Sequence, residues 1–337
     1  MYLIEPVFVS CQDDAVSRQE ARMKSTNPSI NTVLILGAGE LGLPVLRAMS
    51  RQARLSPSLK ISVLLRPEAA RAVSGPLRAR RDALARLGIA VVEGDLQQNG
   101  VEALSALFRS FDAVINCSGF VGGAGTQIKI TQAVLLAGVA RYFPWQFGVD
   151  YDVVGKGSGQ QVWDEQLEVR HLLRAQKATE WVIVSTGIFT SYLFDSGFGV
   201  VDAATKTVRA LGDWRYAVTL TTPADIGRLT AAIFFHRPAF RNQVVYIAGD
   251  TLTYRELADV MQAHWGVEVN RVLLDKERLQ EEVRNHPRDV GAKYRLAFAR
   301  PDGVAWDKAK TFNARQGIAT TTAEQWLAQQ WPISQDG

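Results

Sequence analysis

Short apolar runs, each ended by glycine, proline or a polar residue, alternate with amphipathic stretches between residues 32 and 185. An apolar run bounded in this way predicts a buried strand, and apolar positions three and four residues apart predict a helix. Strands that alternate with helices predict an α/β protein, in which a doubly wound parallel sheet carries helices on both faces. The predicted strands are 33–36, 60–65, 89–93, 112–116, 141–144 and 181–185, and the helices between them include 77–87, 101–108 and 128–140.

The last third of the chain continues with shorter elements. Residues 244–248 predict one more strand, and Thr253-Tyr-Arg-Glu256 forms a capping box that predicts a helix ending near residue 265. We therefore expect a first domain over 31–185 and a smaller α/β lobe over 186–337, interleaved with the core of the first. Residues 1–30 show no sustained periodicity and no basic segment of a secretion signal. We interpret them as a mobile leader or as the result of a misassigned start codon.

Composition narrows the class of protein. With 337 residues, 47% of them hydrophobic, the chain can bury a large core, and no apolar run is long enough to cross a bilayer. The net charge is only +4 and the basic residues are scattered or interleaved with acids, which argues against nucleic acid as a partner. Cys11 and Cys117 lie far apart without metal-ligand or redox spacing, so we expect no metal site and a reducing, cytoplasmic location. The oligomeric state stays open between monomer and homodimer.

The first predicted strand runs directly into a glycine-rich turn, Gly37-Ala-Gly39-Glu40-Leu41-Gly42, followed by a predicted helix. This is the arrangement of a dinucleotide-binding turn. Gly37 allows a tight turn off the strand, Gly39 allows the backbone to approach a pyrophosphate, and Gly42 allows close packing of helix and sheet. The N-terminal amides of the helix would then face the phosphates.

The residue that ends the second strand distinguishes the two nicotinamide dinucleotides. An acidic side chain there binds the ribose hydroxyls of NAD, but this strand ends in Arg66. A guanidinium suits a 2′-phosphate, so the sequence favours NADPH as cofactor, with Arg71 as a second contact. Two alternatives remain: Glu68 acts as a displaced acidic ligand, or Arg66 is simply a solvated residue.

The loops after Asn116, Pro144 and Ser185, at the carboxyl ends of later strands, are predicted to meet at the ligand crevice. In the loop 117–125, Ser118 and Gly119 leave room for the nicotinamide and Phe120 faces a substrate; the alternative is an ordinary flexible loop. The loop 143–152, with Gln146, Phe147 and several aromatic residues, precedes a glycine-rich stretch at 155–159 that resembles a movable cover. Aromatic side chains there favour a small, flat, aromatic substrate, unless they pack in the core.

The predicted helix 162–173 carries a polar residue in the middle of its apolar stripe. Positions 162, 166, 169 and 173 share one face, and Gln166 is the polar one. Its amide either bonds a neighbouring group in the core or points into the pocket.

Taken together, several motifs resemble those of the atypical short-chain dehydrogenase/reductases, and within them the isoflavone reductase, phenylcoumaran benzylic ether reductase and NmrA-like proteins. The resemblance runs from about residue 32 to the C-terminal helix, and it implies a Rossmann-type NADPH-binding domain with a small lobe closing over an aromatic substrate. It also implies that Asp95 and Leu96 lie near the adenine, and that Phe120, Gln146, Phe147 and Phe189 line the nicotinamide and substrate side. The motifs are Gly37-x-Gly-x-x-Gly42, Arg66, Gly94-Asp95-Leu96, Gln127-x-Lys-Ile130, Arg141-Tyr-Phe-Pro-x-x-Phe147-Gly148 and the helix 162–173.

The chain departs from this pattern at Gln166, where plant reductases of the group carry a lysine used as a general base. An amide cannot take a proton near neutral pH, so it can only orient a substrate or a water. A base would have to be another residue, or the reaction would need hydride delivery alone. The candidates are Tyr151, Lys156, Asp164 and Glu165, and Tyr151 and Lys156 have one residue too many between them for the Tyr-x-x-x-Lys motif of ordinary short-chain dehydrogenases.

Two functions remain. The first is an NADPH-dependent reductase of aromatic, phenylpropanoid-like or secondary-metabolite substrates, which the aromatic loop and second lobe favour. The second is an NmrA-like regulatory protein that senses NADP(H) without turnover, which the loss of the lysine favours.

Overall fold

The computed structural model describes residues 30–120 and 122–331. Apart from Ile30, the predicted leader lies outside the described residues. Among these residues, no helix combines the length and apolarity that a bilayer crossing needs.

The centre of the molecule is a sheet of seven strands, all of which pair in parallel. Each strand follows an apolar run of the sequence, and all six strands predicted within 32–185, together with the later one near residue 244, are present. In sheet order the strands are β11 (Gln243–Tyr246), β6 (Glu180–Ser185), β5 (Arg141–Phe143), β4 (Ala113–Asn116), β1 (Thr32–Leu36), β2 (Lys60–Leu65) and β3 (Ala90–Glu93).

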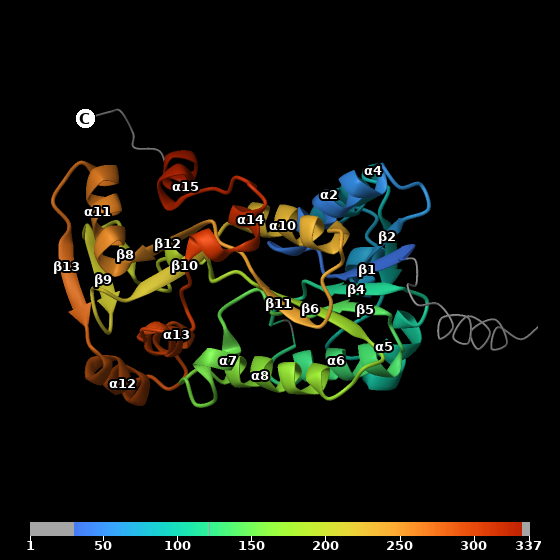
Figure 1. Ribbon diagram of the computed structural model, residues 1–337, viewed down its shortest axis with the longest axis horizontal. Coiled ribbons are helices and arrows are strands. Elements are labelled where there is room, and N and C mark those ends of the chain that lie inside the picture. Colours follow the sequence, from blue (N-terminus) through green and yellow to red (C-terminus); the bar gives the residue numbers. More distant parts are fainter. Residues whose placement is uncertain (1–29, 121, 332–337) are drawn as a thin grey trace, which may run out of the picture.

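Helices cover both faces of this sheet (Figure 1). Alternate residues of β1 enter different cores: Val33 and Ile35 pack on one side, Leu34 and Leu36 on the other. The predicted Rossmann-type doubly wound fold is therefore confirmed. The first side carries α2 (Gly42–Ala53), α4 (Gly75–Arg86) and α10 (Pro223–Phe235), and the second carries α5 (Val101–Phe108), α6 (Thr126–Leu136) and α8 (Gln161–Arg174).

The order of the strands reverses between β1 and β4. Ligands of open parallel sheets bind beyond the carboxyl ends of the strands at such a point. The loops that follow β1 and β4 touch there, since a Cβ atom on Gly37 would lie 3.4 Å from the carbonyl oxygen of Cys117. The topology thus places the glycine-rich turn at the crevice.

Two three-stranded sheets and a third hydrophobic core form the other end of the molecule (Figure 1). One sheet has the order β12-β10-β7 and the other β13-β9-β8. The strands are β7 (Ile188–Phe189), β8 (Val201–Asp202), β9 (Thr207–Leu211), β10 (Ala217–Thr221), β12 (Asp250–Thr253) and β13 (Asn270–Leu274). The remaining helices are α3 (Pro67–Ala70), α7 (Tyr151–Val154), α9 (Thr190–Leu193), α11 (Tyr254–Trp265), α12 (Lys276–Asn285), α13 (Val290–Phe298), a 3₁₀ turn (Lys308–Lys310), α14 (Phe312–Arg315) and α15 (Ala323–Gln330).

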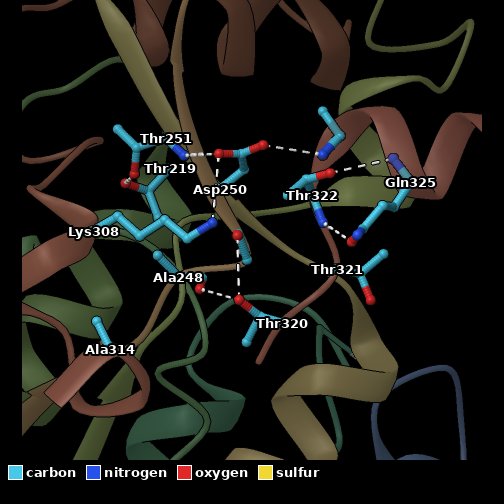
Figure 2. A network of polar contacts seen from close by, with 12 residues as sticks. Thr219, Ala248, Asp250, Thr251, Lys308, Ala314, Thr320, Thr321, Thr322 and Gln325 are labelled. Atoms are coloured by element: carbon cyan, nitrogen blue, oxygen red, sulfur yellow. Dashed lines mark hydrogen bonds and ion pairs between the residues drawn. The ribbon is translucent and has the colours of Figure 1, made fainter. Parts of the chain in front are cut away.

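Polar contacts attach the C-terminal helix α15 to strand β12 (Figure 2). The carboxylate of Asp250 accepts a hydrogen bond from the backbone of Ala323, at the first turn of α15, and lies 3.8 Å from the ammonium of Lys308. The hydroxyl of Thr320 donates to the carbonyls of Ala248 and Gly249. These contacts anchor α15 and the residues before it to the connection between β11 and β12 and to the first residue of β12.

The predicted helix bounds hold at α11 and fail at the end of α6. The capping box of Thr253 and Glu256 is present at the start of α11, which ends at Trp265 as expected. The helix predicted to reach residue 140 instead ends at Leu136. Its continuation was wrong because Gly138 adopts a positive φ of 66°, which turns the chain out of the helix.

An ion cluster that is open to solvent at Asp152 and Arg174 and buried at Arg170 joins α7 to α8. The carboxylate of Asp152 accepts two hydrogen bonds of 2.6 Å from Arg174 and one of 2.7 Å from the buried Arg170. The hydrogen bonds from Arg174 and the charge of Arg170 lower the pKa of Asp152 from 3.8 to about 2. This carboxylate therefore stabilises the folded protein above pH 4, and the stabilisation is lost as the pH falls towards 2.

We expect Asp152→Asn to lower the free energy of unfolding at pH 7 by roughly 1–2 kcal/mol, because Arg170 and Arg174 lose a charged acceptor. Urea unfolding measured between pH 7 and pH 3 should show a difference from the wild type that is constant down to about pH 4 and shrinks below it. A difference that stays constant over this range would contradict the assignment. As a control, Asp259→Asn removes only an exposed ion pair with Arg271 and should cost less than about 0.5 kcal/mol.

Candidate functional site

The glycine-rich turn between β1 and α2 has one open position between two constrained ones. Gly37 has a φ of 90°, and a Cβ atom on Gly42 would lie 2.2 Å from the carbonyl oxygen of Gly37. Both positions therefore require glycine. A Cβ atom on Gly39 would meet no heavy atom within 4 Å. The backbone at Gly39 faces open space that a ligand can approach.

The N-terminus of α2 lies at this open space. No described side chain hydrogen-bonds to its first turn as a cap, and Leu41, at the N-cap position, is buried. Leu43 and Val45 donate to the carbonyls of Gly39 and Leu41, and Pro44 has no amide hydrogen. An anion here would therefore meet the positive end of the helix dipole and the backbone of the turn at Gly39. Glu40 points elsewhere, because its carboxylate accepts a 2.6 Å hydrogen bond from the hydroxyl of Ser191 in α9. This contact joins the turn to the second lobe.

The residues predicted to bind the adenosine half lie at the ends of β2 and β3. Arg66 is exposed and sits immediately before α3, whereas Arg71 is engaged by Glu93 through a hydrogen bond of 2.8 Å. Asp95 accepts hydrogen bonds from the backbone of two following residues and so stabilises its own turn. Leu96 is buried in the core behind that turn.

The loop after β4 is held by a pair of buried amides. Asn116 donates a 2.8 Å hydrogen bond to Gln127 and accepts one of 2.7 Å from the hydroxyl of Ser118. Gln127 in turn donates to the carbonyl of Gly119 at 2.6 Å. These bonds hold the backbone at Ser118 and Gly119, which directly precedes Phe120.

Phe120 meets the loop after β5. Its ring packs edge-on against the ring of Trp145 at 5.3 Å, and both side chains are partly exposed. Phe147, by contrast, is buried in the core between the sheet and α2, and the neighbouring Gln146 is fully buried. Within the loop 143–152, Trp145 is therefore partly exposed beside Phe120, whereas Gln146 and Phe147 are buried.

A chain of buried hydrogen bonds starts at Gln166. The side-chain amide of Gln146 donates to the side-chain oxygen of Gln166 at 2.7 Å, and Arg170 donates to the side-chain oxygen of Gln146 at 2.9 Å. Arg170 also donates to Asp150 at 2.9 Å, and the hydroxyl of Tyr246 donates to Asp150 at 2.6 Å. At this far end, Asp150 and Tyr246 line a cavity of about 360 Å³.

Each of the four candidate bases is either buried or already bound to another group of the protein. Tyr151 is buried, and this burial raises the pKa of its hydroxyl well above the usual range. Lys156 forms an ion pair with Glu168, which raises the pKa of the ammonium and keeps it protonated. Asp164 accepts a hydrogen bond from the backbone of Gly157 at 3.0 Å.

Glu165 caps the neighbouring helix. Its two oxygens accept hydrogen bonds from the backbone of Gly125, Gln127 and Ile128, at 2.9, 2.7 and 3.3 Å, around the first turn of α6. Both oxygens of this carboxylate are thus engaged by backbone amides of α6 and of the residue before it. Sequence reasoning missed this role because forty residues separate Glu165 from Gly125.

The structure thus brings Gln166 and Gln146 together, and separately pairs Phe120 with Trp145. Tyr151 packs against Trp163 and lies with the centre of its ring 5.3 Å from the guanidinium carbon of Arg170, so it borders the chain of buried hydrogen bonds. Lys156 does not join it and is exposed beside Glu168. Arg170 and Asn116 were missed as site-forming residues. The only available signal was their polar type within otherwise apolar segments.

Comparisons with known proteins show the family and the fold. The NmrA-like family matches residues 29–307. An NmrA-like family domain-containing oxidoreductase from Gibberella moniliformis is 44% identical over 298 residues, which cover 88% of this chain and 97% of that protein. Two solved structures have a similar fold, each with a TM-score of 0.71. One is an isoflavone reductase, 24% identical, with 89% of this chain and 99% of that chain covered. The other is the binary complex of leucoanthocyanidin reductase with NADPH from Vitis vinifera, 21% identical, with 88% and 98% covered.

The family match extends over well more than half of the chain, and the motifs that carried the resemblance lie within it. The protein therefore belongs to the NmrA-like family.

Proposed function

We propose that the protein is an NADPH-dependent oxidoreductase that delivers hydride to a small aromatic substrate. The observation that carries this proposal is the open position at Gly39, next to the uncapped N-terminus of α2, at the point where the strand order reverses. A pyrophosphate fits there because backbone amides and the helix dipole favour negative charge. The oxidoreductase from Gibberella moniliformis and the NADPH complex of the Vitis vinifera reductase support the same assignment.

Arg66 is the residue that we expect to select NADPH over NADH. Its guanidinium is exposed at the end of β2, where a 2′-phosphate would lie, whereas Arg71 is engaged by Glu93. Asp95 and Leu96 would then border the adenine through the turn that they stabilise. The backbone of Gly37 to Gly42 would hold the pyrophosphate.

On the nicotinamide side, Ser118 and Gly119 would leave room for the ring, and Phe120 with Trp145 would form an aromatic wall that excludes water. When bound, NADPH supplies the hydride. Gln166 and Gln146 would orient the substrate rather than exchange a proton with it. The partners of Tyr151, Lys156, Asp164 and Glu165 support a reaction that needs no general base from these residues.

The second candidate is a regulatory protein that binds NADP(H) without turnover. The amide at Gln166, in place of the family's lysine, is the observation that favours it. To separate the two functions, NADPH binding is first confirmed by calorimetry, and NADPH consumption is then followed with benzylic ethers, aromatic ketones and aromatic aldehydes. Substrate-dependent consumption supports the reductase, whereas tight binding without consumption supports the regulatory protein.

The cofactor preference predicts a selective effect at Arg66. Arg66→Ala should weaken NADPH binding about tenfold or more, because a charge-assisted contact to the 2′-phosphate is lost, and should change NADH binding less than about threefold. Calorimetric titration with both dinucleotides measures the two effects. Equal losses would refute the 2′-phosphate contact. Arg80→Ala, on the exposed side of α4, serves as the control and should affect neither.

The two glycines of the turn should respond differently to an added methyl group. Gly39→Ala should preserve the melting temperature yet weaken NADPH binding at least about tenfold, since the methyl enters only the space assigned to the pyrophosphate. Gly42→Ala should lower stability by about 2 kcal/mol or more, because its methyl collides with the carbonyl of Gly37. If Gly39→Ala bound NADPH as tightly as the wild type, the phosphate site would lie elsewhere.

A further inference from the structure

Three fully buried polar side chains lie in series at the carboxyl ends of β5 and β6. Arg170, Gln146 and Gln166 each have 0% exposure. The Nε of Arg170 lies 2.9 Å from Oε1 of Gln146, and Nε2 of Gln146 lies 2.7 Å from Oε1 and 2.9 Å from the backbone oxygen of Gln166. No bulk water reaches this series, so its members depend on one another for hydrogen bonds.

The chemistry of arginine determines how both amides are oriented. A guanidinium only donates hydrogen bonds, so the atom of Gln146 that faces Arg170 must be its oxygen. Its nitrogen must then face Gln166 and donate to it. The side-chain atom of Gln166 that accepts this bond must be oxygen. The two amides therefore cannot flip without placing two donors against each other.

This series leaves one donor without a partner. Nε2 of Gln166 is buried and forms no hydrogen bond within residues 30–120 and 122–331. Buried donors are normally paired, and an exception calls for an explanation. The donor belongs to the side chain that contacts Gln146, next to the loop where Trp145 meets Phe120.

We propose that Arg170 is a positioning residue that acts through Gln146 to present Nε2 of Gln166 as a hydrogen-bond donor to the substrate. This inference rests on the proposed reductase function. The group that it selects is a neutral acceptor oxygen, as in a carbonyl or an ether. The amide binds this oxygen without giving up its own proton, so the alkoxide that hydride transfer to a carbonyl leaves would take its proton from solvent water as the product leaves the site. Substrates that must lose a proton at this position are disfavoured.

Replacing Gln146 by glutamate reverses the direction of the hydrogen bond between residues 146 and 166 and leaves Gln166 itself unchanged. In Gln146→Glu, the carboxylate still accepts from Arg170 but cannot donate, so Gln166 must turn its nitrogen towards residue 146. We expect turnover of an aromatic ketone to fall at least tenfold, with NADPH affinity unchanged within threefold. Gln166→Glu, which has no donor, should behave alike. Gln132→Glu, exposed on α6, is the matched control and should change neither quantity.

A double variant distinguishes positioning from a merely structural role. In Gln146→Glu/Gln166→Lys, the ammonium can donate to the new carboxylate and still offer a donor to the substrate. This variant should recover most of the ketone turnover that Gln146→Glu loses. A double variant no better than Gln146→Glu, in protein that melts like the wild type, would overturn the proposal.

Nuclear magnetic resonance on the wild-type protein keeps the test independent of turnover. With uniform ¹³C and ¹⁵N labelling, the ligand-free spectrum should show a through-hydrogen-bond coupling between Nε2 of Gln146 and Cδ of Gln166, and this coupling reports the amide orientation whatever the protein's function. With NADP⁺ bound, acetophenone should shift the Gln166 amide protons downfield, and ethylbenzene, which lacks the oxygen, should not. Equal shifts with both, or no shift with acetophenone, would overturn the proposal. Failure to bind NADP⁺ would instead overturn the proposed function.

Discussion

The site depends on the guanidinium of Arg170, a charge with no access to water. Burial of a cation is tolerated only where acceptors surround it, and here they are Gln146, Asp150, Asp152 and Ser185. These acceptors come from the loop after β5, from α7 and from the end of β6. Because Tyr246 donates to Asp150, the edge strand β11 joins the same cluster. One side chain on α8 therefore holds together the carboxyl ends of three neighbouring strands.

This cluster gives the site two contrasting halves. On the side of β5 and β6, buried polar contacts fix Gln146 and Gln166 in one orientation. On the side of β1, the turn offers backbone amides and open space at Gly39. A rigid half suits the orientation of a reacting group, whereas an open half suits the entry of a long, charged cofactor. The contact between Glu40 and Ser191 links the open half to the second lobe.

Features encoded over a few residues were predicted from the sequence. The strands, the capping box at Thr253 and the NmrA-like resemblance are confirmed. They could be predicted because each corresponds to a pattern within a short stretch of sequence. The glycine turn is present with the strand and helix expected on either side, although its ligand stays a proposal. The end of α6 was misjudged because one glycine at 138 outweighed an apolar periodicity that continued past it.

Features that depend on distant partners could not be predicted. Glu165 caps a helix that begins forty residues earlier, and Asp150 meets Tyr246 ninety-six residues later. A polar residue such as Gln166 within an apolar stripe signals only that some partner exists. The direction of its amide follows from Arg170 and Gln146, whose spacing in the sequence carries no recognisable motif. The roles of Tyr151 and Lys156 depended likewise on burial and pairing that only the fold determines.

The most direct test of this account is an experimental structure of the protein with NADPH bound. We expect the pyrophosphate against the backbone of Gly39 to Leu41, the 2′-phosphate beside Arg66, and the nicotinamide between Phe120 and Gln166. A dinucleotide bound away from this turn, or a nicotinamide remote from Gln166, would contradict this expectation.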